Sequence, residues 1–190
     1  MNSDITIVSG LPRSGTSLMM QMLDNGGIEV VTDNIRTADT DNPRGYYEYE
    51  QVKKIKEDKA WLPPTRGKAF KMISQLLYDL PASEKYRVIF MERDFDEMLD
   101  SQEKMLQRLG RPAAPRDQIK RSFNAHLNKL YAWLKEQRNF EVLFVRYNEL
   151  MQNPQEQANR VHSFLGGRTN LDKMVKSVDP SLYRNRKASS

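Results

Sequence analysis

The stretch that decides the fold is Gly10-Leu11-Pro12-Arg13-Ser14-Gly15-Thr16-Ser17, which lies between an apolar run and a segment of helical periodicity. The run before it, residues 5–9, reads Ile-Thr-Ile-Val-Ser, a pattern typical of a buried parallel strand. From residue 16 to about residue 25, apolar side chains recur at helical spacing, and a Gly-Gly pair then predicts the end of a helix. A strand, a glycine turn and a helix in this order predict the start of an α/β domain.

The same stretch has the chemistry of a phosphate-binding loop. Its glycines allow successive backbone N–H groups to converge on phosphate oxygens, and the helix N-terminus adds a partial positive charge. Arg13 supplies a full charge, while Thr16 and Ser17 supply hydroxyl donors. The alternative is a plain strand-to-helix turn, but such a turn rarely needs two glycines, an arginine and three hydroxyls together.

The spacing of the loop matches the nucleoside triphosphatase motif G-x-x-x-x-G-K-[ST], with one departure. Thr16 occupies the position of the lysine that reaches the β- and γ-phosphates of a bound triphosphate. The missing lysine therefore argues against ordinary phosphoryl transfer from ATP or GTP.

The rest of the chain alternates between strand and helix patterns. Strands are predicted at 68–73, 87–91 and 141–145, with residues 28–31 as a further candidate. Helices are predicted at about 47–60, 95–109, 115–137 and 154–165, and residues 32–47 read as a long loop. Strands separated by helices pair in parallel through right-handed crossovers. We therefore expect one domain over residues 1–190, a three-layer α/β/α fold with a central parallel sheet of the P-loop nucleoside-kinase kind.

Composition narrows the chemistry further. The 190 residues include no cysteine and two histidines, which excludes disulfides and cysteine-ligated metals and disfavours a histidine metal cluster. The net charge is +5, and positive and negative residues are interspersed along the chain, which is typical of a solvated surface. The positive excess also helps to attract a polyanionic nucleotide. With neither a signal-peptide pattern nor a long apolar segment, a cytoplasmic location without a membrane span is expected.

A second polar element follows the strand predicted at 87–91. Arg93 comes at the carboxyl end of that strand, where α/β sheets bind ligands, and Ser101 lies about two helical turns further on. A guanidinium fork and a hydroxyl suit a phosphomonoester. Taken alone, the Arg-Asp pair fits helix capping equally well.

The loop at residues 10–17 resembles the 5′-phosphosulfate-binding loop of the sulfotransferase family. The resemblance implies that Arg13, Ser14, Gly15, Thr16 and Ser17 hold the 5′ end of 3′-phosphoadenosine 5′-phosphosulfate (PAPS). The Arg93–Ser101 element resembles the family's 3′-phosphate site. A later part of the family pattern is similar to three segments of this chain: Val142–Leu150, Asn153-Pro154 and Phe164–Gly166. Within the first of them, Tyr147 matches a tyrosine near the adenine. Anchoring the strand end is an equal alternative for Tyr147.

The resemblance also implies a reacting centre. Lys71 matches a family lysine near the transferred sulfuryl group, and Arg13 is the second cation, so no metal is required. The alternative for Lys71 is a lysine on an edge strand that serves solubility. The histidine that often follows this lysine is absent from Lys71-Met72-Ile73-Ser74. Glu48, within a segment similar to Asn-Pro-Lys-Gly-Tyr-Phe-Glu of bacterial members, is the preferred general base. His126 is the alternative base, although a lone histidine on an apolar helix face is more often structural.

The resemblance makes PAPS the expected donor, adenosine 3′,5′-bisphosphate (PAP) the product, and a hydroxyl or amine the acceptor. The basic residues 183–187 either cover the 3′-phosphate or form a solvated tail. Two other functions stay open: a small-molecule kinase on the same fold, and a non-catalytic nucleotide-binding module. Neither nucleic-acid binding nor a particular acceptor or oligomeric state is indicated.

Overall fold

The computed structural model describes residues 4–33, 35 and 45–179. Four parallel strands form one sheet in the order β2-β1-β3-β4. The strands are β1 (Ile5–Gly10), β2 (Ala69–Ile73), β3 (Tyr86–Glu92) and β4 (Phe140–Arg146). The α-helices are α1 (Thr16–Asn25), α2 (Phe95–Arg108), α3 (Arg116–Glu136), α4 (Tyr147–Gln152), α5 (Pro154–Phe164) and α6 (Leu171–Lys176). Three 3-10 helices complete the described part: η1 (Glu50–Lys54), η2 (Pro63–Thr65) and η3 (Ser74–Asp79).

The strands are apolar on both faces, and their side chains alternate between two cores. In β1, Ile5 and Ile7 join the core beneath α3 and the 3-10 helices, whereas Val8 joins the core beneath α1, α4, α5 and α6. The same alternation runs through β3, where Val88 and Ile89 point to opposite cores. Burial on both faces explains why the central strands β1 and β3 read as continuous apolar runs. The expected three-layer α/β/α fold with a parallel central sheet is confirmed.

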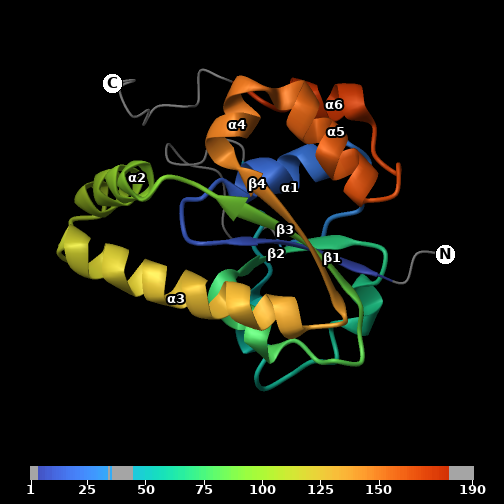
Figure 1. The fold of residues 1–190 in the computed structure, drawn as a ribbon, viewed down its shortest axis with the longest axis horizontal. Coiled ribbons are helices and arrows are strands. Elements are labelled where there is room, and N and C mark those ends of the chain that lie inside the picture. The colour runs from blue at the N-terminus through green and yellow to red at the C-terminus, as the bar shows by residue number, and fades with distance from the viewer. Residues whose placement is uncertain (1–3, 34, 36–44, 180–190) are drawn as a thin grey trace.

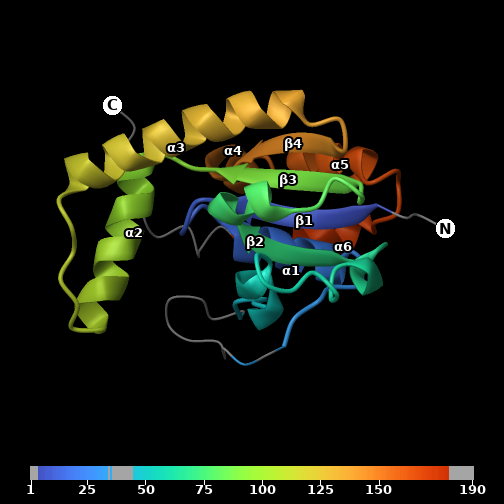
Figure 2. The same ribbon diagram turned by 90° about the horizontal axis from the view of Figure 1, so that it is seen from below.

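The helices place polar residues at the carboxyl edge of the sheet. Figures 1 and 2 show α3 across one face of the sheet and α1, α4, α5 and α6 on the other, while α2 and the first part of α3 extend past the strand ends. The chain enters α1 from β1 and α2 from β3. Both predicted phosphate elements therefore open onto the same edge, as expected for a ligand site in a parallel α/β sheet.

Two predicted elements differ from the structure. The helix expected at about 47–60 is replaced by a segment without regular secondary structure over residues 45–49, followed by η1. The cause is tertiary hydrogen bonding, since the carbonyl groups of Tyr46 and Glu48 accept bonds from distant residues instead of from a helix. The strand expected at 28–31 is reduced to one isolated bridge between Val30 and Ala69. In the described part of the chain, no helix is long and apolar enough to cross a membrane.

Candidate functional site

The phosphate loop ends at a helix whose first turn is prepared for an anion. Gly15 is the N-cap residue of α1 in the left-handed conformation, with φ 100°. Within the described structure, this helix start has no side-chain cap and no acidic residue in its first turn. Its N–H groups and partial positive charge suit an anionic ligand. The hydroxyl of Ser14 adds a donor, since it is buried and has no hydrogen-bond partner among the described residues.

Gly15 is also required by its surroundings. A Cβ atom on this residue would lie 2.4 Å from Cδ2 of Tyr147, far inside contact distance. The Tyr147 ring, 7% exposed, thus packs directly under the loop. Burial raises the pKa of the Tyr147 hydroxyl, so it stays protonated at neutral pH.

Three residues predicted to bind phosphate groups meet beside this loop. Arg13 Nε donates a hydrogen bond to Ser101 Oγ over 2.9 Å, and one terminal nitrogen of Arg93 donates to the Arg13 carbonyl over 3.3 Å. The two sequence elements, separated by about 80 residues, form one cluster. Such a cluster has the guanidinium groups and the hydroxyl that a phosphomonoester needs.

Buried contacts fix the orientation of Arg93. Its Nε donates to Glu97 Oε2 over 3.1 Å, and the side chains of this pair are 8% and 2% exposed. Its guanidinium carbon lies 4.3 Å from the centroid of the Tyr147 ring, in cation–π geometry. Capping of α2 is done by Asp94, whose carboxylate accepts from the N–H groups of Asp96 and Glu97. Arg93 is thus directed to the site while its neighbour caps the helix.

A pocket of about 530 Å³ adjoins the loop on the α3 side of the sheet. Its wall includes Ser14 and Arg93, together with Asn128 and Tyr131 of α3 and Asn148 after β4. Tyr147 is absent from this wall and instead supports the loop and Arg93 from below.

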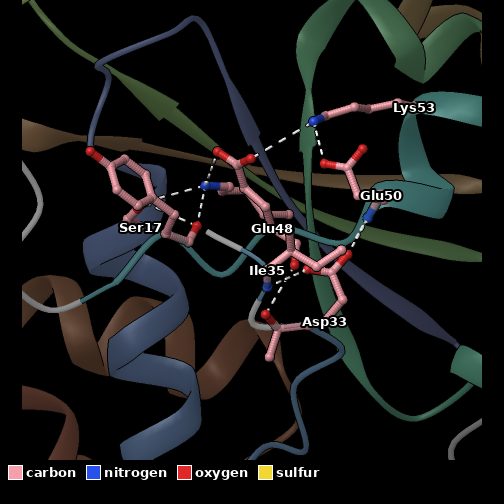
Figure 3. A network of polar contacts seen from close by, with 9 residues as sticks. Ser17, Asp33, Ile35, Glu48, Glu50 and Lys53 are labelled. Atoms are coloured by element: carbon pink, nitrogen blue, oxygen red, sulfur yellow. Dashed lines mark hydrogen bonds and ion pairs between the residues drawn. The ribbon is translucent and has the colours of Figure 1, made fainter. Parts of the chain in front are cut away.

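A second group of residues, which includes Ser17 and Glu48, lies at the start of α1 (Figure 3). Lys71 Nζ, on β2, contacts Ser17 Oγ at 3.4 Å and also donates to the Tyr46 carbonyl. Its distance to Glu48 Oε1 is 4.0 Å, and its side chain is only 15% exposed. A solubility lysine would face solvent, so this position instead places a cation beside the start of α1. Ser17 Oγ also donates to the Tyr46 carbonyl over 3.4 Å.

Glu48 lies between two ammonium groups. Lys71 approaches one carboxylate oxygen at 4.0 Å, and Lys53 approaches the other at 3.9 Å. The Glu48 side chain is 24% exposed, so solvent reaches part of it. The structure therefore brings Ser17 and Glu48 next to the same ammonium group, that of Lys71.

The alternative base, His126, has structural partners. Its Nε2 lies 2.9 Å from Ser74 Oγ, just beyond β2, and its ring packs edge-on against Tyr78. Burial lowers the pKa of His126, so its neutral form is favoured. The other histidine, His162, also has a local partner, because its Nδ1 contacts Thr169 Oγ1 at 2.8 Å. Residues 183–187 lie outside the described residues.

Two site residues were missed from the sequence. Glu97, four residues after Arg93, could have been found from the spacing of opposite charges across the start of the predicted helix. The Tyr46 carbonyl gives no sequence signal, because its contacts with Lys71 and Ser17 depend on the tertiary fold.

Comparison with known proteins identifies the family of the chain. The family model for the sulfotransferase domain matches residues 3–190, so the chain belongs to the sulfotransferase domain family, a family of PAPS-dependent transferases. Comparison with curated protein sequences finds no match.

Solved structures of low sequence identity share the fold. The sulfotransferase from Alicyclobacillus acidocaldarius is 16% identical, with a TM-score of 0.52 over 89% of this chain and 82% of that one. Mouse sulfotransferase SULT7A1 complexed with PAP is 17% identical, with a TM-score of 0.53 over 100% of this chain and 69% of that one. The sulfotransferase domain from the curacin biosynthetic pathway is 13% identical, with a TM-score of 0.51 over 98% of this chain and 93% of that one. The predicted family and enzyme class are thereby confirmed.

Proposed function

We propose that this protein transfers the sulfuryl group of PAPS to a hydroxyl or amine acceptor by in-line displacement. One observation carries the proposal: cationic and hydroxyl side chains converge on the two flanks of a single phosphate loop. Arg13, Arg93 and Ser101 meet on one flank, and Ser17, Lys71 and Glu48 meet on the other. PAPS carries phosphate at its 3′ end and phosphosulfate at its 5′ end, so it can engage both flanks at once.

The two flanks have different roles in this proposal. Arg93 and Ser101 hold the 3′-phosphate, while the loop from Arg13 to Ser17 holds the 5′-phosphosulfate through N–H groups and hydroxyls. The loop residues fit this group because the Ser14 hydroxyl is buried, unpartnered in the described structure and located at the loop. Tyr147 supports Arg93 and the loop from beneath, so its adenine contact stays a prediction.

The reaction forms one bond to sulfur and breaks another. The acceptor oxygen or nitrogen attacks sulfur, the bond from sulfur to the 5′-phosphate oxygen breaks, and PAP leaves. Glu48 takes the proton of the acceptor, while Lys71 and Arg13 balance the charge that develops on the sulfuryl and leaving phosphate oxygens. Lys71 and Arg13 are held in place before the reaction begins. Such preorganised charges supply most of the rate enhancement of a transfer of this kind.

The test is turnover of PAPS, followed as PAP release with water and with a panel of phenol, sugar, lipid and peptide acceptors. Glu48→Gln should lower kcat by about 10²- to 10⁴-fold, the usual contribution of a general base, and leave PAP affinity within about twofold. Lys71→Met keeps the apolar stem but removes the charge, and should also lower kcat. Lys68→Met is the matched control, because Lys68 pairs with Glu29 and lies just before β2. Turnover that is equal in all four proteins would contradict the proposed centre.

A further inference from the structure

The backbone beside the proposed base is held in an unfavourable conformation. Among the described residues, Arg13 and Tyr47 are the non-glycine residues with positive φ, at 67° and 52°. Arg13 belongs to the phosphate loop, and Tyr47 directly precedes Glu48. A left-handed non-glycine residue persists only where surrounding contacts over-determine it, and such residues concentrate at functional sites. The position of Glu48 therefore depends on the contacts that hold residues 46–50.

The upstream end of this segment is anchored to the phosphate loop and α1. The Tyr46 carbonyl accepts hydrogen bonds from Lys71 and Ser17. The Tyr47 hydroxyl donates to Asp24 Oδ2 over 3.1 Å, and burial, with the nearby Asp24 carboxylate, raises the pKa of Tyr47 to about 12.

The downstream end is anchored to residues 32 and 33 (Figure 3). Asp33 N–H donates to the Glu48 carbonyl over 3.1 Å, and Thr32 Oγ1 donates to the same carbonyl over 2.9 Å. The Asp33 carboxylate then accepts from Glu50 N–H over 2.6 Å and from Ile35 N–H over 3.1 Å. Asp33 thus bonds to the carbonyl group of Glu48 and to the N–H group of Glu50, which belong to the two peptide groups on either side of the Cα atom of residue 49.

We propose that Asp33 is a positioning residue for the general base Glu48, acting through the backbone of residues 48–50. This inference rests on the proposed function, in which Glu48 takes the acceptor proton. The two hydrogen bonds of Asp33 fix the backbone from which the Glu48 side chain reaches the space between Lys71 and Lys53. A misplacement of about 1 Å at a reacting group can cost about a hundredfold in rate, so loss of this clamp should appear in turnover.

Asn is the informative substitution at residue 33. Asp33→Asn keeps the size of the side chain and the backbone N–H bond to Glu48, but replaces one acceptor oxygen with an NH₂ group. The carboxylate accepts two N–H bonds, and an amide side chain has only one oxygen for that role. Asp58→Asn is the matched control, because Asp58 Oδ1 accepts the N–H of Ala60 over 2.8 Å in a similar local turn.

The experiment is a double-mutant cycle on the full chain, with Asp33→Asn, Glu48→Gln, the double variant and Asp58→Asn. Two quantities are measured: the Kd for PAP by calorimetry and the rate of PAP release from PAPS with water as acceptor. In that probe reaction water attacks sulfur, Glu48 takes its proton, the bond from sulfur to the 5′-phosphate breaks, and sulfate and PAP leave. Asp33→Asn should reduce the rate about 10- to 100-fold with the Kd for PAP changed less than twofold. In the Glu48→Gln background it should have no further effect, because there is no base left to position.

Each other result overturns the inference in a distinguishable way. A rate for Asp33→Asn equal to that of Asp58→Asn means that the clamp does not position the base. Equal losses in the presence and absence of Glu48, or a parallel loss of PAP affinity, mean that Asp33 acts on general structure. PAP binding by the wild type without turnover of PAPS, either with water or with any of the phenol, sugar, lipid and peptide acceptors, contradicts a catalytic role of Glu48 and this inference with it. Failure of the wild type to bind PAP contradicts the proposed function itself.

Discussion

Arg13 Nε donates a hydrogen bond to Ser101 Oγ over 2.9 Å, although 88 residues separate the two in sequence. This bond joins the loop after β1 to the second turn of α2. It forms because parallel strands β1 and β3 are neighbours and bring their carboxyl ends together. The relationship makes the two predicted phosphate elements parts of one site.

The first prediction concerns the hydroxyl of Ser101. If Ser101 holds a 3′-phosphate, Ser101→Ala should weaken PAP binding by about tenfold, the worth of one hydrogen bond to a charged group. Adenosine 5′-monophosphate lacks the 3′-phosphate, so its affinity should change much less. Calorimetric titration with both ligands measures the difference. Ser163→Ala, at an exposed position of α5, is the control and should change neither.

The second prediction concerns the close packing of Gly15 on Tyr147. Gly15→Ala forces a Cβ atom to within 2.4 Å of the ring and a left-handed φ on alanine. We expect a loss of about 3 kcal/mol or more in the free energy of unfolding, together with loss of PAP binding. Gly110→Ala is the control, since φ is 64° but no atom lies within 4 Å of the added Cβ among the described residues, and strain alone should cost about 1 kcal/mol. Equal urea-denaturation midpoints for the two variants would contradict this packing argument.

The third prediction concerns the buried pair of Arg93 and Glu97. Glu97→Gln leaves a buried guanidinium without its anionic partner at Nε, and such a change typically costs about 3 kcal/mol or more of stability. Glu103→Gln removes a carboxylate of the same helix that pairs with Arg116 at a partly exposed site, and should cost less than about 1 kcal/mol. Urea unfolding of both variants measures the difference. A small effect at Glu97 would mean that Arg93 is held by its other contacts.

The fourth prediction concerns the pH dependence contributed by His126. Burial lowers the pKa of this imidazole below its usual 6.5, so the unfolded chain binds a proton at higher pH than the folded chain. The stability from neutral His126 is therefore full above pH 6.5 and is lost as pH falls toward the lowered folded pKa. His126→Asn lacks this dependence, so wild type should lose stability relative to the variant between pH 7.5 and 5. Urea unfolding at these two pH values tests the sign.

The same variant separates the two candidate bases. With Glu48 as the base, His126→Asn should leave turnover of PAPS within a few-fold of wild type, whereas Glu48→Gln lowers it strongly. The opposite pattern would assign the base to the imidazole near Ser74.

The phosphate elements could be predicted from the sequence because their signals are local. Residues 10–17 combine a strand end, two glycines and a helix start within eight positions, and Arg93 directly follows a strand. The surroundings of Glu48 could not be predicted in this way. Its segment looked helical, but Thr32 and Asp33 engage its backbone and Lys71 engages the Tyr46 carbonyl, contacts that only the folded chain supplies. The single-domain boundary, the compartment and the role of residues 183–187 stay predictions.

The measurement that tests the central claim most directly is a calorimetric titration of the wild type with PAP in the absence of metal, with ATP plus Mg²⁺ titrated in parallel. The account predicts that PAP binds without metal, more tightly than adenosine 5′-monophosphate and more tightly than magnesium–ATP. A preference for magnesium–ATP, or no binding of PAP, would contradict the proposed donor site.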